Sequence, residues 1–168
     1  MSDTLTMSGL LRIYEIPDDL LDGKQWRRLT LKEKEREGRL VVEAHNMIMS
    51  AGRTQILSFI GASGSTNAFA QYYAVGTGTV YSINTGDASL ASELFRAIPA
   101  SFSVVGNAVT ISTSFSTSQA NGAYTNAGVF GNNATSTPGS GVLMAHVLYS
   151  YVKTSSINIF NDYTITAA

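Results

Sequence analysis

The side chains best suited to acid–base chemistry or metal binding are two histidines and a few carboxylates. His45 and His146 lie far apart in the sequence, and neither has a second histidine or a cysteine at the spacing of a metal site. Asp87, Glu93 and Asp162 form no obvious catalytic pair, although separate strands could bring them together. His146 follows the apolar alternation of a predicted strand, so we expect a core or interface histidine rather than a ligand or base.

Two glycine-containing segments match nucleotide-binding loops only in part. Gly76-Thr-Gly78 lacks the third glycine of a dinucleotide fingerprint, because Tyr81 occupies that position. Gly61-Ala-Ser-Gly64 is not followed by the lysine of a phosphate-binding loop. We interpret both segments as turns. Since serine and threonine are too abundant for one of them to stand out as a nucleophile, the sequence predicts a protein that is not an enzyme and uses no cofactor or metal.

Charge is concentrated in the first third of the chain. Eighteen of the 23 charged side chains lie in residues 1–53, nine acidic and nine basic, and the net charge of the chain is −1. Such a chain lacks the positive field that binds nucleic acids or anionic membranes, so neither is an expected partner. No apolar run approaches the roughly 20 residues that cross a bilayer, and we expect no membrane insertion.

This distribution predicts two regions. Residues 1–45 are expected to form a charged N-terminal arm that docks on a neighbour, and residues 46–168 a β-rich domain. Tryptophan and arginine are enriched where interfaces concentrate their binding energy. The candidate anchor is therefore Trp26 with Arg27 and Arg28. The alternative is that the alternating charges after this anchor cover an ordinary solvated hairpin or helix.

Helix signals are few in the β-rich region. Ser50 can cap a helix that runs to about residue 60, where Gly61 supplies the stop. Asp87 or Ser89 can cap a second and shorter helix that runs to Leu94. Glu93 and Arg96 are expected to form a local ion pair.

Strand signals dominate the same region. Gly106-Asn107 marks a two-residue hairpin turn. After it, Val109, Ile111 and Phe115 point one way and hydroxyl side chains the other, which is typical of a half-buried antiparallel strand. Residues 157–165 alternate in the same manner. We predict a mainly β fold with a minor α contribution, an antiparallel β-sandwich or small barrel with one packed helix and the charged arm.

The β-rich region is poor in charge and rich in hydroxyl and tyrosine side chains, which favours contact between identical subunits. A surface with few ions has a small desolvation cost when copies meet. We expect a homo-oligomer, with a trimer favoured, and the candidate interface tyrosines are Tyr124, Tyr149 and Tyr151. The loop at residues 131–141 is either an exposed binding tip or a plain flexible connection.

From about residue 46 onward, the order of segments resembles a family of small tailed-bacteriophage virion proteins, described as tail-fibre or tail-associated proteins. The matching segments are Asn46-Met-Ile-Met-Ser-Ala-Gly-Arg53, Val75-Gly-Thr-Gly-Thr79, Ser89-Leu-Ala-Ser-Glu-Leu-Phe-Arg96, Asn126-Ala-Gly-Val-Phe130, Gly141-Val-Leu-Met-Ala145 and the final Thr-rich strand that begins at Lys153. The resemblance implies a virion structural protein and carries over no catalytic residues.

We therefore expect a phage structural protein made in the host cytoplasm and exposed on the surface of the virion. It is either a tail-fibre, tail-tip or baseplate component or a capsid decoration (cement) protein. Its expected partners are copies of itself, the tail or major capsid protein, and a host-surface receptor. The alternative is a soluble carbohydrate-binding β-domain, for which the candidate tyrosines are Tyr72, Tyr73, Tyr124, Tyr149 and Tyr151, although core packing is the default for most of them.

Overall fold

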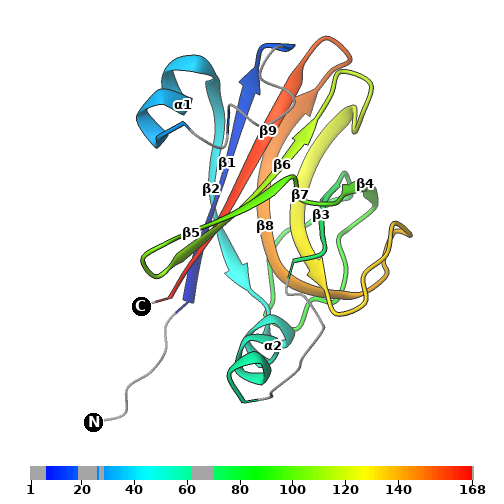
Figure 1. The fold of residues 1–168 in the computed structure, drawn as a ribbon. Helices are drawn as coiled ribbons and strands as arrows, with labels where there is room; N and C mark the ends of the chain where they lie inside the picture. Colours follow the sequence, from blue (N-terminus) through cyan, green and yellow to red (C-terminus); the bar gives the residue numbers. More distant parts are fainter. Residues whose placement is uncertain (1–6, 19–25, 27–28, 62–69, 168) are drawn as a thin grey trace.

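In the computed structural model, which describes residues 7–18, 26, 29–61 and 70–167, the chain forms one nine-stranded antiparallel sheet that curls into a half-barrel (Figure 1). The order across the sheet is β4-β3-β7-β8-β2-β1-β9-β6-β5. The strands are β1 (Met7–Ile16), β2 (Arg39–Ile48), β3 (Tyr72–Gly76), β4 (Glu93–Ala97), β5 (Ser101–Val105), β6 (Ala108–Phe115), β7 (Gly122–Gly131), β8 (Val142–Lys153) and β9 (Asn158–Ala167). The prediction of a mainly β fold is confirmed, and the sheet is closer to a small barrel than to a sandwich.

The curl brings distant strands of the sheet into contact. Phe95 on β4 and Phe115 on β6 pack edge to face, with ring centroids 5.4 Å apart. Tyr73 on β3 packs against Tyr163 on β9 at 6.2 Å. The two edge strands, β4 and β5, are consecutive in the chain and are joined by residues 98–100. The hydrophobic core therefore lies inside the curl.

The charged N-terminal region is part of this sheet and is not a separate arm. β1 lies between β2 and β9 and pairs with β9 from Met7 to Ile16. Leu11 and Ile13 are fully buried, whereas Arg12 between them lies opposite Glu43 of β2 and pairs with it at 2.8 Å. The predicted boundary after residue 45 falls inside β2, so it is wrong. Charge in this region marks the solvated face of central strands.

The two helices lie at opposite ends of the half-barrel (Figure 1). α1 (Leu31–Glu37) begins after a capping box in which Thr30 and Glu33 bond each other's backbone N–H. α2 (Ser50–Gly61) confirms the helix predicted near residues 50–60. A Cβ atom at Gly52 would lie 2.3 Å from the carbonyl oxygen of Met144, so glycine lets α2 approach β8 closely. Among the described residues, no helix has the length and apolar character needed to cross a membrane.

The prediction of a second, shorter helix that runs to Leu94 is wrong. Leu94 lies in β4, where Phe95 pairs with Val75 of β3. Pairing with β3 supplies backbone hydrogen bonds that a single short helical turn in isolation does not offer.

The predicted hairpin and its buried face are confirmed. Gly106 has φ +59°, and Asn107 has a negative φ, as in a type II′ turn. Ile111 and Phe115 are buried, as are Ile159 and Tyr163 on the neighbouring strand. The predicted solvated outer face is wrong in part, because Ser112, Phe160 and Asp162 on that face are also buried, where Trp26 and α1 cover it.

Candidate interaction sites

Trp26 is a core residue and offers no surface to a partner. Its side chain is fully buried between β1, β9 and α1, with ring centroids 5.0 Å from Tyr14 and 5.2 Å from Phe160. The ammonium of Lys34 lies 5.4 Å from the indole centroid. The prediction that Trp26 is an exposed docking anchor is therefore wrong, because the outer face of β1 and β9 needs this ring to cover it. Arg27 and Arg28 lie outside the described residues.

The candidate interface tyrosines are mostly packing residues of the half-barrel. Tyr124 is buried, and its hydroxyl donates to the carbonyl oxygen of Ala120. Tyr149 and Tyr151 are half-buried against it, with ring centroids 6.3 and 6.0 Å from that of Tyr124. Burial raises the pKa of all three phenols. These rings have little free area for a second subunit or a sugar.

The same holds for the other tyrosines proposed for sugar binding. Tyr73 is buried and contributes to the core. Tyr72 is half-buried, with the guanidinium of Arg96 at 5.7 Å from its ring centroid.

Arg96 and Glu93 form the predicted local ion pair, and it is buried. Their side chains are only 2% and 6% exposed, and two hydrogen bonds of 2.5 and 2.6 Å join them. Arg96 also donates to the carbonyl oxygens of Thr135 and Ser140 at 2.9 and 3.2 Å, while the N–H of Gly139 donates to Glu93 at 3.0 Å. The loop at residues 131–141 is thus anchored to β4 by a charged pair, which contradicts a plain flexible connection.

Asp162 also has a structural role, as an acceptor of hydrogen bonds. Its two oxygens accept hydrogen bonds from Lys34 and Ser112, each at 2.6 Å, and both ionic partners are nearly buried. This arrangement ties α1 to the outer face of β9 and β6. It brings Asp162 to a lysine rather than to a second acid. Within the described parts of the chain, no group of three or more histidine, cysteine or acidic side chains could hold a metal ion.

His146 is buried, as the sequence predicts, and it meets Asp87. Its Nδ1 lies 3.2 Å from Asp87 Oδ2. Burial lowers the pKa of His146, and the hydrogen bond and charge of Asp87 oppose that shift only in part. At neutral pH the ring is therefore neutral, and Nδ1–H donates to the carboxylate. Nε2 is then an acceptor, and it has no hydrogen-bond partner in the described part of the chain.

Tyr81 was not selected as a binding residue from the sequence, but it is the most exposed of the large apolar or aromatic side chains described. It lies in the loop between β3 and β4, and its side chain is 94% exposed. A usable signal existed, because Tyr81 is the aromatic residue of a segment otherwise rich in threonine, serine, asparagine and glycine. A ring outside a strand has no inward-facing position that would bury it.

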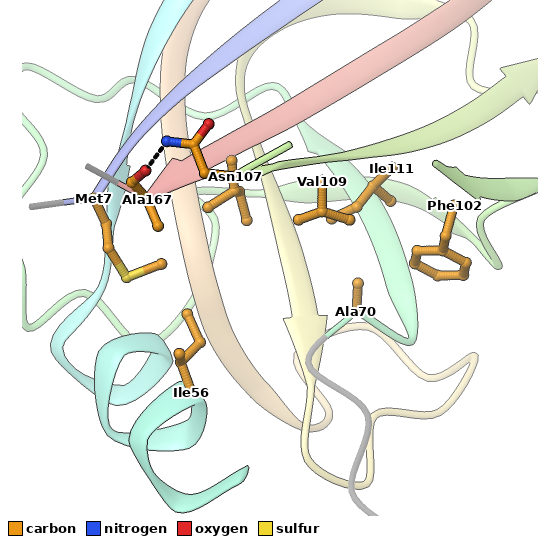
Figure 2. Close-up of a pocket in the computed structure, with 9 residues that line it drawn as sticks. Met7, Ile56, Ala70, Phe102, Asn107, Val109, Ile111 and Ala167 are labelled. Carbon is orange, nitrogen blue, oxygen red and sulfur yellow. Dashed lines mark hydrogen bonds between the residues drawn. The ribbon is translucent and has the colours of Figure 1, made fainter. Parts of the chain in front are cut away.

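One end of the half-barrel holds an apolar hollow of about 490 Å³ (Figure 2). Its lining includes Met7 of β1, Ile56 of α2 and Ile165 of β9, together with Phe102 and Val109 of the β5–β6 hairpin. The side chain of Asn107 closes a corner by donating to the carbonyl oxygen of Ala167.

The hollow continues onto an exposed apolar edge. β5 is the last strand of the sheet, and within the described ranges it pairs with β6 alone. Phe102, Val104 and Val105 are 55%, 75% and 75% exposed. Phe102 and Val104 point to one face of the strand and Val105 to the other, so apolar side chains are exposed on both faces of this edge, which marks a candidate contact surface.

Comparison with known proteins gives no assignment. The chain matches no protein-family model, and no curated protein or solved structure is significantly similar to it.

Proposed function

We propose that this chain is a non-enzymatic structural protein of a tailed-bacteriophage particle, exposed on the virion surface and assembled from several identical copies. The segment order from residue 46 onward supports the phage assignment. A tail-fibre, tail-tip or baseplate position is favoured over capsid decoration. A separate docking arm would favour decoration of the capsid, but the first strands belong to the central sheet instead.

The observation that carries self-assembly is the free edge of β5. In a two-residue hairpin, the residues that flank the turn form a hydrogen-bonded pair, here Val105 and Ala108. By alternation, Phe102 and Val104 direct their N–H and C=O groups away from β6 toward the free edge. Natural edge strands usually carry lysine, proline or another charge that blocks pairing, and Ser101-Phe-Ser-Val-Val105 carries none.

A second copy fits this edge in antiparallel register. If Ser103 lies opposite Ser103 of the other copy, then Phe102 faces Val104 and Val104 faces Phe102. The outward-pointing backbone groups then meet one another, and an aromatic ring packs against a β-branched side chain. Such a two-fold contact gives a dimer. The trimer favoured from the sequence requires β5 to meet a different surface in a closed ring, so the measured mass of the oligomer separates the two arrangements.

Replacing Val104 by lysine is expected to convert the assembly into monomers, because the new charge would be buried at the contact. The free energy of unfolding of the protomer should change by no more than about 0.5 kcal/mol, since Val104 is exposed. Sedimentation velocity at several protein concentrations measures the change. Val152→Lys is the matched control, because Val152 is 60% exposed on β8, an interior strand. A wild-type chain that stays monomeric, or a Val104→Lys variant that assembles normally, would refute the proposed contact.

The particle assignment is tested with purified phage. Mass spectrometry of the particles should detect the chain, and gold-labelled antibodies viewed by electron microscopy should mark the tail or its tip. Label spread over the head would instead identify a capsid decoration protein. Absence of the chain from the purified particles by mass spectrometry would overturn the virion assignment.

A further inference from the structure

The loop between β3 and β4, residues 77–92, carries a polar depression that the proposed function leaves unused. The depression has a volume of about 360 Å³. Its lining includes Thr79, Tyr81, Ser82, Asp87, Ser89 and His146. An exposed aromatic ring, a carboxylate, a buried histidine and several hydroxyl groups therefore meet at one place on the surface.

Tyr81 projects from a loop whose backbone is held in place. The N–H groups of Thr77 and Gly78 donate to the carbonyl oxygens of Ser92 and Ala91, each at 3.0 Å, which closes the base of the loop. Thr85 accepts from the N–H at the start of α2 at 2.8 Å. The nearly complete exposure of Tyr81 is thus a property of an anchored loop. A large ring left in water on such a loop has the surface to bind an apolar face of a ligand.

Asp87 is oriented beside this ring and keeps an oxygen free. Oδ2 accepts from the N–H of Asn84 at 3.1 Å and from His146 Nδ1 at 3.2 Å. Oδ1 accepts no hydrogen bond from the described part of the chain, and the side chain is 26% exposed. Two donors hold the carboxylate in one orientation, so its free oxygen is a positioned acceptor.

His146 is the second and independent indication of a ligand. Its side chain is 2% exposed, and it lines the depression from β8. With Nδ1–H committed to Asp87, Nε2 is a buried acceptor without a partner among the described residues. Buried polar atoms are normally hydrogen-bonded, so an acceptor without a partner on a residue that lines the depression indicates a missing donor.

We propose that this depression, which we call the Tyr81 site, binds a neutral saccharide. A sugar ring has an apolar C–H face that stacks on an aromatic ring, and its hydroxyl groups donate to carboxylate and imidazole acceptors. Residues 77–92 contain no lysine or arginine, and Asp87 would repel an acidic ligand. The charge of the site therefore selects neutral over anionic sugars.

This inference deepens the proposed function, since a sugar-binding loop on a virion surface would face the glycans of the host. It does not depend on that function, because the site is defined within one chain. The virion assignment and the proposal of saccharide binding can therefore be refuted independently. The chain can be absent from particles and still bind glycans, or it can be present and bind none.

The test is a glycan array probed with the purified full-length chain, displayed multivalently, followed by calorimetric titration with the best neutral glycan. Wild type should bind neutral glycans, and Tyr81→Ala should weaken the affinity about tenfold, the upper range for an aromatic contact. Asp87→Asn should also weaken binding, since it removes the charged acceptor. Tyr81→Phe is the matched control, because it keeps the stacking ring and should bind within about threefold of wild type.

Three results would overturn the proposal. An array without a hit would remove saccharide binding, and hits confined to acidic glycans would contradict the selectivity for neutral sugars. Wild-type affinity in Tyr81→Ala would place binding elsewhere on the chain. Thermal melts separate loss of binding from loss of folding, since Tyr81 is exposed and its replacement should leave the melting temperature unchanged.

Discussion

Replacing Trp26 by alanine is expected to lower the free energy of unfolding by about 3–5 kcal/mol, which is the usual cost of removing a large buried ring. The indole contacts Tyr14 of β1 and Phe160 of β9, and Lys34 of α1 lies over its face. A Cβ atom at Gly38 would lie 2.8 Å from the same ring, so the space around it is already full. The ring therefore joins α1 to the two strands beneath it.

Urea unfolding followed by circular dichroism measures this loss directly, because that signal does not depend on Trp26, the only tryptophan in the chain and the residue replaced. Trp26→Phe should cost less than Trp26→Ala, because a smaller ring fills part of the cavity. Tyr81→Ala, a change at an exposed ring, serves as the reference with little expected effect. A loss below about 1 kcal/mol for Trp26→Ala would mean that the indole is not packed. The interpretation of Trp26 as a docking anchor would then return.

Replacing Arg96 by alanine is expected to cost a similar 3–5 kcal/mol. The change leaves Glu93 as a buried charge without its partner, and it removes the donor to the carbonyl oxygens of Thr135 and Ser140. It also removes the guanidinium that lies 4.6 Å from the ring centroid of Phe130. The loop at residues 131–141 should lose its anchor, so its amide hydrogens should exchange faster than those of the sheet.

A double-mutant cycle with Glu93→Gln tests the cause of this loss. The double variant should be more stable than Arg96→Ala alone, because no uncompensated charge is left inside the protein. Arg36→Ala is the matched control, since Arg36 and Glu37 form an ion pair whose side chains are 72% and 42% exposed. That exposed pair should contribute no more than about 1 kcal/mol. Equal losses for Arg96→Ala and Arg36→Ala would show that the Arg96 pair is solvated.

The sequence alone determined the features that depend on neighbouring residues. Gly106 and Asn107 specify the hairpin turn because few residues adopt a positive φ at its first position. The helix after Ser50 and the buried faces of β6 and β9 follow from short periodic patterns. The ion pair of Glu93 and Arg96 was also predictable from spacing, but its burial and its hold on the loop at residues 131–141 were not.

Only the tertiary structure decided the features that depend on distant residues. Trp26 is buried because Phe160, from the other end of the chain, lies beneath it, and Asp87 meets His146 because β8 passes under the loop. Charge in the first third indicated an arm, yet in a strand every second side chain can face water while its neighbours enter the core. Local patterns carry no information on which strands become neighbours, and that choice placed β1 at the centre of the sheet and left β5 and Tyr81 exposed.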